Sequence, residues 1–334
     1  RVQGIWPARP RKFGIRKMNE LIERIFLPPR SSSHAANVDN LFMFCTYLSI
    51  IFFVIVAGAA IYFAWKYKRK SENDKTPHIE HNLTLEIVWS VVPLILVMIV
   101  FFWGLTDYLV ARVAPNDSFE VQVTAKKWLW EFQYPDGTKS INRMYVPLGR
   151  PIRVVMTSDD VLHSFFLKDF RVKQDIVPGR YTDLWFQATN AGVYDLQCTE
   201  YCGKDHSKML AKVNVMGPAE YAKFLAEGPE ELKKAFAENP AKLGAEVYAN
   251  AGCQSCHSVD GSKNQGPTWK GIWGQVHQFT DGTSAKVDEN YIQNSIINPQ
   301  GQIVKGYEPI MPTYQGALRD IEIKALIAYI KTLQ

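Results

Sequence analysis

The sequence has few cysteines and, beyond its first 40 residues, no excess of either charge. Five cysteines among 334 residues are too few for a scaffold held by disulfides, and four of them form two close pairs. Residues 1–40 contain eight basic and three acidic side chains, whereas residues 41–334 contain 30 of each, which argues against a nucleic-acid-binding face on a folded domain. A hydrophobic content of 47% excludes a disordered or fibrous chain. The paired cysteines therefore indicate metal, haem or redox chemistry.

Two long segments, residues 41–65 and 87–105, lack charged side chains altogether. A helix needs roughly 20 apolar residues to cross a bilayer core, and tryptophans lie near the ends of both segments, as in interfacial belts. We therefore expect a transmembrane hairpin with spans at residues 41–65 and 87–107, preceded by a basic tail at residues 1–40. Two buried helices of a soluble protein are the alternative.

The charges beside the first span predict its orientation. Lys66, Lys68, Arg69 and Lys70 directly follow this span, and short cytoplasmic loops are rich in basic residues. The loop between the spans is therefore expected in the cytoplasm, with both ends of the chain outside. The basic tail argues for the opposite orientation, although most of its charges are distant from the span.

The remainder of the chain changes from β-type to helical patterns. Short β-type runs separated by Pro- and Gly-containing turns fill residues 116–216, which predicts an all-β sandwich or barrel. Residues 217–240 are rich in Ala, Glu and Lys and predict a helical linker. Helical periodicity near both ends of residues 241–334, around a loop-rich region, predicts a small all-α domain. The fold class is thus a multidomain membrane protein.

Two thiols, an imidazole and a thioether lie within twelve residues, at Cys198, Cys202, His206 and Met209. A neighbouring strand can bring His163 to the same loop. Sulfur and imidazole ligands together suit copper. The alternatives are a structural zinc site made by the two cysteines and two histidines, and a disulfide between the cysteines.

The detailed pattern, Cys-x-Glu-x-Cys-Gly-x-x-His-x-x-Met after a distant Val-Leu-His-Ser-Phe, resembles the binuclear copper (CuA) loop of subunit II of haem–copper cytochrome c oxidases. The resemblance covers about residues 35–216 and implies a two-helix anchor that carries a cupredoxin-like sandwich. It also implies that the two cysteines bridge two copper ions. The copper ligands that it implies are His163, Cys198, the backbone carbonyl of Glu200, Cys202, His206 and Met209.

The same resemblance gives roles to three further side chains. Trp128, in Trp128-Leu129-Trp130, would lie where electrons reach the copper domain, and its alternative is an ordinary core residue. Glu86, in a Glu-x-x-Trp pattern, would form the mouth of a proton path into the partner subunit, and its alternative is a carboxylate that stabilises a helix N-terminus. The Glu200 carboxylate would reach a magnesium ion shared with that partner.

The motif Cys253-Gln254-Ser255-Cys256-His257 is the signature of c-type haem attachment. Its cysteines form two thioether bonds to haem, and its histidine supplies an axial nitrogen to iron. Met311 is the only methionine after this motif, and we expect it as the sixth ligand because a thioether raises the haem potential relative to a second imidazole. His277 is the rival ligand. The order of helix, haem motif, methionine and final helix resembles class I cytochrome c.

These features together resemble the oxidases whose subunit II carries its own cytochrome. An external donor, such as a cytochrome c or a quinol-oxidising complex, would reduce haem c, and electrons would pass through copper to the haem–copper subunit I. That partner would reduce oxygen to water with proton pumping. We expect the chain in the bacterial inner membrane, with both metal domains on the periplasmic side. The alternatives are the equivalent subunit of a copper-containing nitric oxide or nitrous oxide reductase, and a non-catalytic membrane shuttle or copper-delivery protein.

Overall fold

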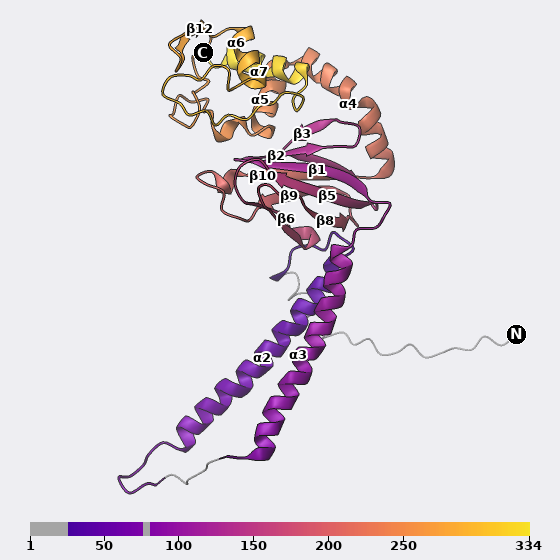
Figure 1. The fold of residues 1–334 in the computed structure, drawn as a ribbon, viewed down its shortest axis with the longest axis vertical. Coiled ribbons are helices and arrows are strands. Elements are labelled where there is room, and N and C mark those ends of the chain that lie inside the picture. Colours follow the sequence, from indigo (N-terminus) through magenta and orange to yellow (C-terminus); the bar gives the residue numbers. More distant parts are fainter. Residues whose placement is uncertain (1–25, 76–80) are drawn as a thin grey trace, which may run out of the picture. The chain divides into compact units, whose positions relative to one another are not determined.

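The computed structural model describes residues 26–75 and 81–334, so most charges of the expected basic tail lie outside the described residues. The chain forms two compact units, and the first, which ends at Leu109, contains α2 (Ala35–Lys66) and most of α3 (Leu83–Arg112) (Figure 1). Both helices are long and apolar enough to span a membrane. They contact each other through Phe44 and Trp103, whose ring centroids are 5.6 Å apart. Each helix extends beyond the expected span at both ends.

The second unit begins with a β-sandwich of two five-stranded sheets (Figure 1). One sheet has the order β3-β2-β1-β5-β8, and the other has the order β4-β10-β9-β6-β7. The strands of the first sheet are β1 (Phe119–Lys126), β2 (Leu129–Gln133), β3 (Lys139–Ile141), β5 (Pro151–Ser158) and β8 (Thr182–Gln187). Those of the second are β4 (Arg143–Pro147), β6 (His163–Leu167), β7 (Val172–Ile176), β9 (Gly192–Cys198) and β10 (Leu210–Met216). The sandwich confirms the predicted all-β domain.

Alternating side chains explain why these segments form a sandwich. In β1, Val121, Val123 and Ala125 are buried while Gln122 is exposed, as expected for a strand with one face in the core. Strands β1 and β5 pair in parallel, and so do β10 and β4, whereas the remaining pairs are antiparallel. The core between the sheets is filled by large side chains, among them Trp130, Phe132, Phe165 and Phe186.

A helical domain follows the sandwich, after the linker helix α4 (Pro218–Glu238). Its helices are α5 (Pro240–Asn250), α6 (Glu289–Ile297) and α7 (Asp320–Thr332), and a small hairpin is formed by β11 (Val276–Gln278) and β12 (Ser284–Lys286). The side chain of Asn239 caps α5 by accepting a hydrogen bond from the Lys242 N–H. Helices α5 and α7 approach closely at Gly244, where an added Cβ would lie 2.0 Å from the Ala325 carbonyl oxygen. This domain confirms the predicted helical cytochrome c region, although α6 and the hairpin fall where loops were expected.

The sandwich and the helical domain share apolar contacts within the second unit. Leu129 of β2 and Ile141 of β3 are buried in the core of the helical domain. The linker helix α4 stacks Phe224 on Tyr145 of the sandwich, with ring centroids 4.4 Å apart, and packs Phe236 against the helical core. The linker helix is therefore packed against both domains.

Candidate metal centres

The cysteine-rich loop joins β9 to β10 and is held by backbone hydrogen bonds at both ends. Cys198 is the last residue of β9, and its N–H donates to the Met209 carbonyl oxygen at 3.3 Å. The Thr199 N–H donates to the Ser164 carbonyl oxygen at 3.2 Å, which joins the loop to β6. His163 is the first residue of β6, a strand beside this loop. Sheet pairing therefore brings together ligands that are 35 positions apart in the chain.

The expected copper ligands converge around the two thiol sulfurs. The Sγ atoms of Cys198 and Cys202 are 3.9 Å apart. Nδ1 of His163 lies 3.8 Å from Cys198 Sγ, and Nδ1 of His206 lies 3.4 Å from Cys202 Sγ. The Met209 sulfur is 3.7 Å from Cys202 Sγ. A disulfide has an S–S distance of about 2.05 Å, so the two cysteines are free thiols in this structure.

The backbone also contributes a donor to this cluster. The carbonyl oxygen of Glu200 lies 3.3 Å from Cys198 Sγ, as the predicted ligand set requires. The ligand atoms of His163, Cys198 and Cys202 all lie within 4.8 Å of one another, and all three residues are buried. A metal ion at this place would thus meet sulfur and nitrogen atoms of buried side chains.

Asp160, which sequence reasoning missed, orients His163. Its Oδ1 lies 2.8 Å from His163 Nε2, so a proton on Nε2 leaves Nδ1 free to bind a metal. Burial lowers the pKa of His163, but its hydrogen bonds to Asp160 and Cys198 outweigh burial and the net pKa is raised. The sequence shows Asp160 three residues before His163, but this spacing points to a contact between them only after His163 has been identified as a ligand.

The two thiols differ in acidity. Burial raises the pKa of Cys198, but hydrogen bonds from His163 and the backbone outweigh burial and the net pKa is lowered. Burial and the neighbouring Cys198 raise the pKa of Cys202 to about 12. Cys202 is thus a protonated thiol at neutral pH in the metal-free protein, and metal binding must displace its proton.

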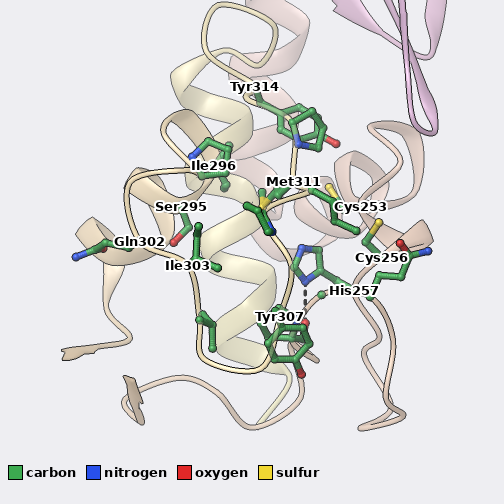
Figure 2. A pocket seen from close by; sticks show the side chains of 18 of the residues that line it. Cys253, Cys256, His257, Ser295, Ile296, Gln302, Ile303, Tyr307, Met311 and Tyr314 are labelled. Atoms are coloured by element: carbon green, nitrogen blue, oxygen red, sulfur yellow. Dashed lines mark hydrogen bonds between the residues drawn. The ribbon is translucent and has the colours of Figure 1, made fainter. Parts of the chain in front are cut away.

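The second cluster lines a crevice in the helical domain (Figure 2). The 3₁₀ turn Cys253–Ser255 carries the first cysteine of the motif, and Cys256, His257 and Met311 line the same space. Counting the part open to solvent, the crevice encloses about 990 Å³. Figure 2 shows the side chains of His257 and Met311 directed into this space beside the two cysteines. Two thiols, an imidazole and a thioether thus line the crevice, and these groups fit haem c.

The rival sixth ligand has a different position. His277 lies on β11, where its Nδ1 is 3.0 Å from the hydroxyl oxygen of Tyr291. Tyr291 lines the crevice, as does Met311. The structure therefore brings the predicted methionine, and not the histidine, to the crevice wall.

The crevice adjoins a cavity at the cysteine-rich loop, called the copper loop below. Cys256 and Gln265 line both the crevice and this cavity, which is also lined by Trp128, Cys202 and Gly203. Trp128 packs against the loop, since a Cβ at Gly203 would lie 3.2 Å from its ring. The predicted site of electron transfer into the copper domain therefore faces the haem motif of the same chain.

The two predicted carboxylates differ in their surroundings. Glu86 Oε1 accepts a hydrogen bond from the Asn82 N–H at 3.1 Å, and Asn82 Oδ1 accepts one from the Leu85 N–H at 3.1 Å. These contacts cap α3 and match the helix-terminus alternative for Glu86. Glu200 is half-buried beside the cysteine pair. The proton-path and magnesium roles stay predictions.

Three sequence profiles match successive parts of the chain. Residues 21–106 match the transmembrane domain of cytochrome c oxidase subunit II, residues 138–216 match its periplasmic domain, and residues 241–334 match cytochrome c. This order agrees with the family and fold class expected from the sequence.

Individual proteins with the same description align over much of the chain. Cytochrome c oxidase subunit 2 of Alkalihalophilus pseudofirmus is 28% identical over 92% of this chain and 90% of its own length. Its counterpart from Cereibacter sphaeroides is 28% identical over 60% of this chain and 78% of its own length. One solved structure is that of the periplasmic domain of subunit II of cytochrome oxidase from Bradyrhizobium japonicum. Its alignment covers 36% of this chain and 99% of the crystallised domain, with 32% identity and a TM-score of 0.34.

Proposed function

Because the chain belongs to the subunit II family of cytochrome c oxidases and carries a fused cytochrome c domain, we propose that it delivers electrons from an external donor to a terminal oxidase. The carriers are haem c in the helical domain and a binuclear copper centre in the sandwich. Oxygen is reduced to water, with proton pumping, in the partner subunit I. The chain itself is one component of this oxidoreductase and translocase.

The observation that carries this proposal is the set of donors around two cysteine sulfurs 3.9 Å apart. Thiolate, imidazole and thioether ligands suit copper, and six donors are more than a tetrahedral zinc site uses. The centre, when bound, exchanges one electron that is shared between two metals. The residues that hold it are His163, Cys198, Glu200 through its carbonyl, Cys202, His206 and Met209.

The crevice residues hold haem c in the same proposal. Cys253 and Cys256 would hold the haem through thioether bonds, and His257 and Met311 would supply a nitrogen and a sulfur to its iron. Haem c, when bound, supplies reversible one-electron chemistry, and the methionine raises its potential relative to a second histidine. The position of Met311 on the crevice wall supports this assignment.

Trp128 is the side chain at which electrons reach the copper domain. It shares a cavity with Cys256 of the haem motif and with Cys202 of the copper loop. The immediate electron source for copper is therefore the fused cytochrome domain, and the external donor, a cytochrome c or a quinol-oxidising complex, reduces that domain.

The remaining assignments concern the membrane and the partner. Glu86 marks the mouth of a proton path into subunit I, and the Glu200 carboxylate reaches a magnesium ion shared with that subunit. The chain lies in the bacterial inner membrane with both metal domains in the periplasm. The apolar surfaces of α2 and α3 support the membrane location.

Purification of the complex from membranes tests the proposal. We expect a haem–copper integral subunit to copurify, with oxygen uptake, near-infrared absorption from copper and the bands of haem c. Cys198→Ser should abolish the copper absorption while haem c persists, and Cys45→Ser, which changes a cysteine outside both pairs, should affect neither. Zinc in place of copper, or a stable lone chain without oxygen uptake, would contradict the proposal.

A further inference from the structure

Asp205 lies at the contact between the copper loop and the cytochrome domain. It directly precedes the copper-ligand position His206, and only 4% of its surface is exposed. Its Oδ1 is 2.8 Å from the ammonium nitrogen of Lys208 on the same loop. Its Oδ2 accepts a hydrogen bond from the side-chain amide of Gln265, which belongs to the cytochrome domain. A buried carboxylate of the sandwich is thus bonded across the domain boundary.

The cytochrome end of this hydrogen bond belongs to the segment that holds the haem ligand. Gln265 is followed by Gly266, whose N–H donates to the Cys256 carbonyl oxygen at 2.9 Å. The next residue, Pro267, places its carbonyl oxygen 2.7 Å from Nδ1 of His257. The bond from Asp205 therefore connects the copper loop to a segment whose backbone is hydrogen-bonded to the haem motif.

Other contacts between the domains are of a different kind. Leu129 and Ile141 enter the helical core, and apolar burial of this type is strong but has little directionality. A buried hydrogen bond to a carboxylate is directional, and breaking it leaves the charge partly unpaired away from water. Apolar burial thus holds the two domains together, whereas the hydrogen bond selects one orientation.

We propose that the Asp205–Gln265 hydrogen bond fixes the haem crevice on the copper loop, and that both residues are positioning residues for electron transfer between the two centres. This inference rests on the proposed function. Neither side chain binds a metal or haem. Asp205 acts through the adjacent His206, and Gln265 acts through Gly266 and Pro267, which are hydrogen-bonded to the haem motif.

The test uses the intact oxidase complex and two substitutions of one residue. Gln265→Glu places a second carboxylate against Asp205, and Gln265→Ala removes the donor without adding charge. In both variants we expect amide-hydrogen protection of residues 264–266 to fall about tenfold, the size expected for losing a hydrogen bond to a charged group. The copper-to-haem distance distribution from pulsed electron paramagnetic resonance should broaden, and internal electron transfer should slow while both optical spectra are retained.

A compensating pair and a matched control sharpen the test. Asp205→Asn combined with Gln265→Glu exchanges the donor and acceptor roles and should restore protection and a narrow distance distribution. Gln278→Glu makes the same charge change at an exposed position of β11 and should leave both measurements unchanged.

Two results would overturn the positioning role. One is unchanged protection and distance in both Gln265 variants, and the other is a double variant no better than Gln265→Glu alone. Absence of the copper or haem signals from the unsubstituted complex would instead contradict the proposed function, so the two failures are distinguishable.

Discussion

Nδ1 of His257 lies 2.7 Å from the carbonyl oxygen of Pro267, and this contact decides which nitrogen the ring presents to the crevice. With the proton on Nδ1, Nε2 is the nitrogen left free for iron. Burial lowers the pKa of His257, which keeps the imidazole in the neutral form that binds metals. The chain therefore sets both the tautomer and the charge of the proposed haem ligand.

Gly266→Ala should disturb this ligand. A Cβ at position 266 would lie 2.6 Å from Cε1 and 2.9 Å from Nδ1 of His257, so the ring must move. We expect part of the haem to become high-spin or to be lost, measured from the optical spectrum and the haem content of purified protein. Gly217→Ala, where an added Cβ meets nothing within 4 Å, is the control. A normal low-spin spectrum in the Gly266 variant would show that the ring does not depend on this space.

Met311→Ala should remove the sixth ligand. The haem is expected to become high-spin or to show a substantially lower reduction potential, because a thioether ligand raises that potential. His277→Ala should leave both properties unchanged, since its ring contacts Tyr291 from β11. Spectra and redox titrations of the two variants side by side show which residue is the sixth haem ligand. An effect seen only in His277→Ala would assign His277 instead of Met311.

Gly244→Ala should destabilise the cytochrome domain. An added Cβ would lie 2.0 Å from the Ala325 carbonyl oxygen and 2.7 Å from the Cβ of Tyr329, so α5 and α7 must separate. Overpacking of this kind costs ~1–3 kcal/mol, measured as a lower denaturant midpoint followed by haem absorbance. Ala249→Ser adds one atom on the exposed side of α5 and should have little effect. Equal midpoints for the glycine variant and the parent would mean that the helices separate at no cost.

His34 should make stability depend on pH. The ring is 7% exposed and packs edge-on against Trp185 at 4.3 Å, and burial lowers the pKa of His34 from 6.5. The unfolded chain then binds the proton more readily, so the stability contributed by the neutral ring is present above about pH 6.5 and is lost as pH falls toward the folded-state pKa.

His34→Phe keeps an aromatic ring and removes the titration, so its unfolding temperature should fall less between about pH 8 and about pH 5.5. Thermal unfolding of both proteins at the two pH values measures the difference. His81→Phe at an exposed position is the control. If the unfolding temperatures of His34→Phe and the parent fall equally on acidification, His34 does not cause the pH dependence of stability.

Composition and short-range spacing predicted much of this molecule. The uncharged windows predicted α2 and α3, and alternating side chains such as Val121 and Val123 predicted the sandwich. The copper loop could be predicted from the sequence because four side-chain donors lie within twelve residues, so the loop itself brings them together. His163 was a candidate because a neighbouring strand could bring it to the loop, and the family pattern then supported it, since its spacing from the cysteines has no local meaning.

The parts that sequence reasoning missed depend on contacts between distant segments. Asp205 and Gln265 are 60 positions apart, and neither has a pattern that marks it as a partner of the other. Leu129 and Ile141 alternate like ordinary strand residues, yet their side chains belong to the core of another domain. The reciprocal cap between Asn82 and Glu86 is local, and a helix-start signal at Asn82 could have revealed it.

The linker helix α4 packs Phe224 on the sandwich and Phe236 on the helical core, which makes the cytochrome a tethered reactant. Its local concentration beside the copper loop is set by chain geometry rather than by the size of a cytochrome pool. In the proposed route, the internal transfer therefore needs no collision and is insensitive to dilution and ionic strength. Reduction by a separate charged donor remains a collision and slows as salt screens its attraction, so one salt series separates the two steps.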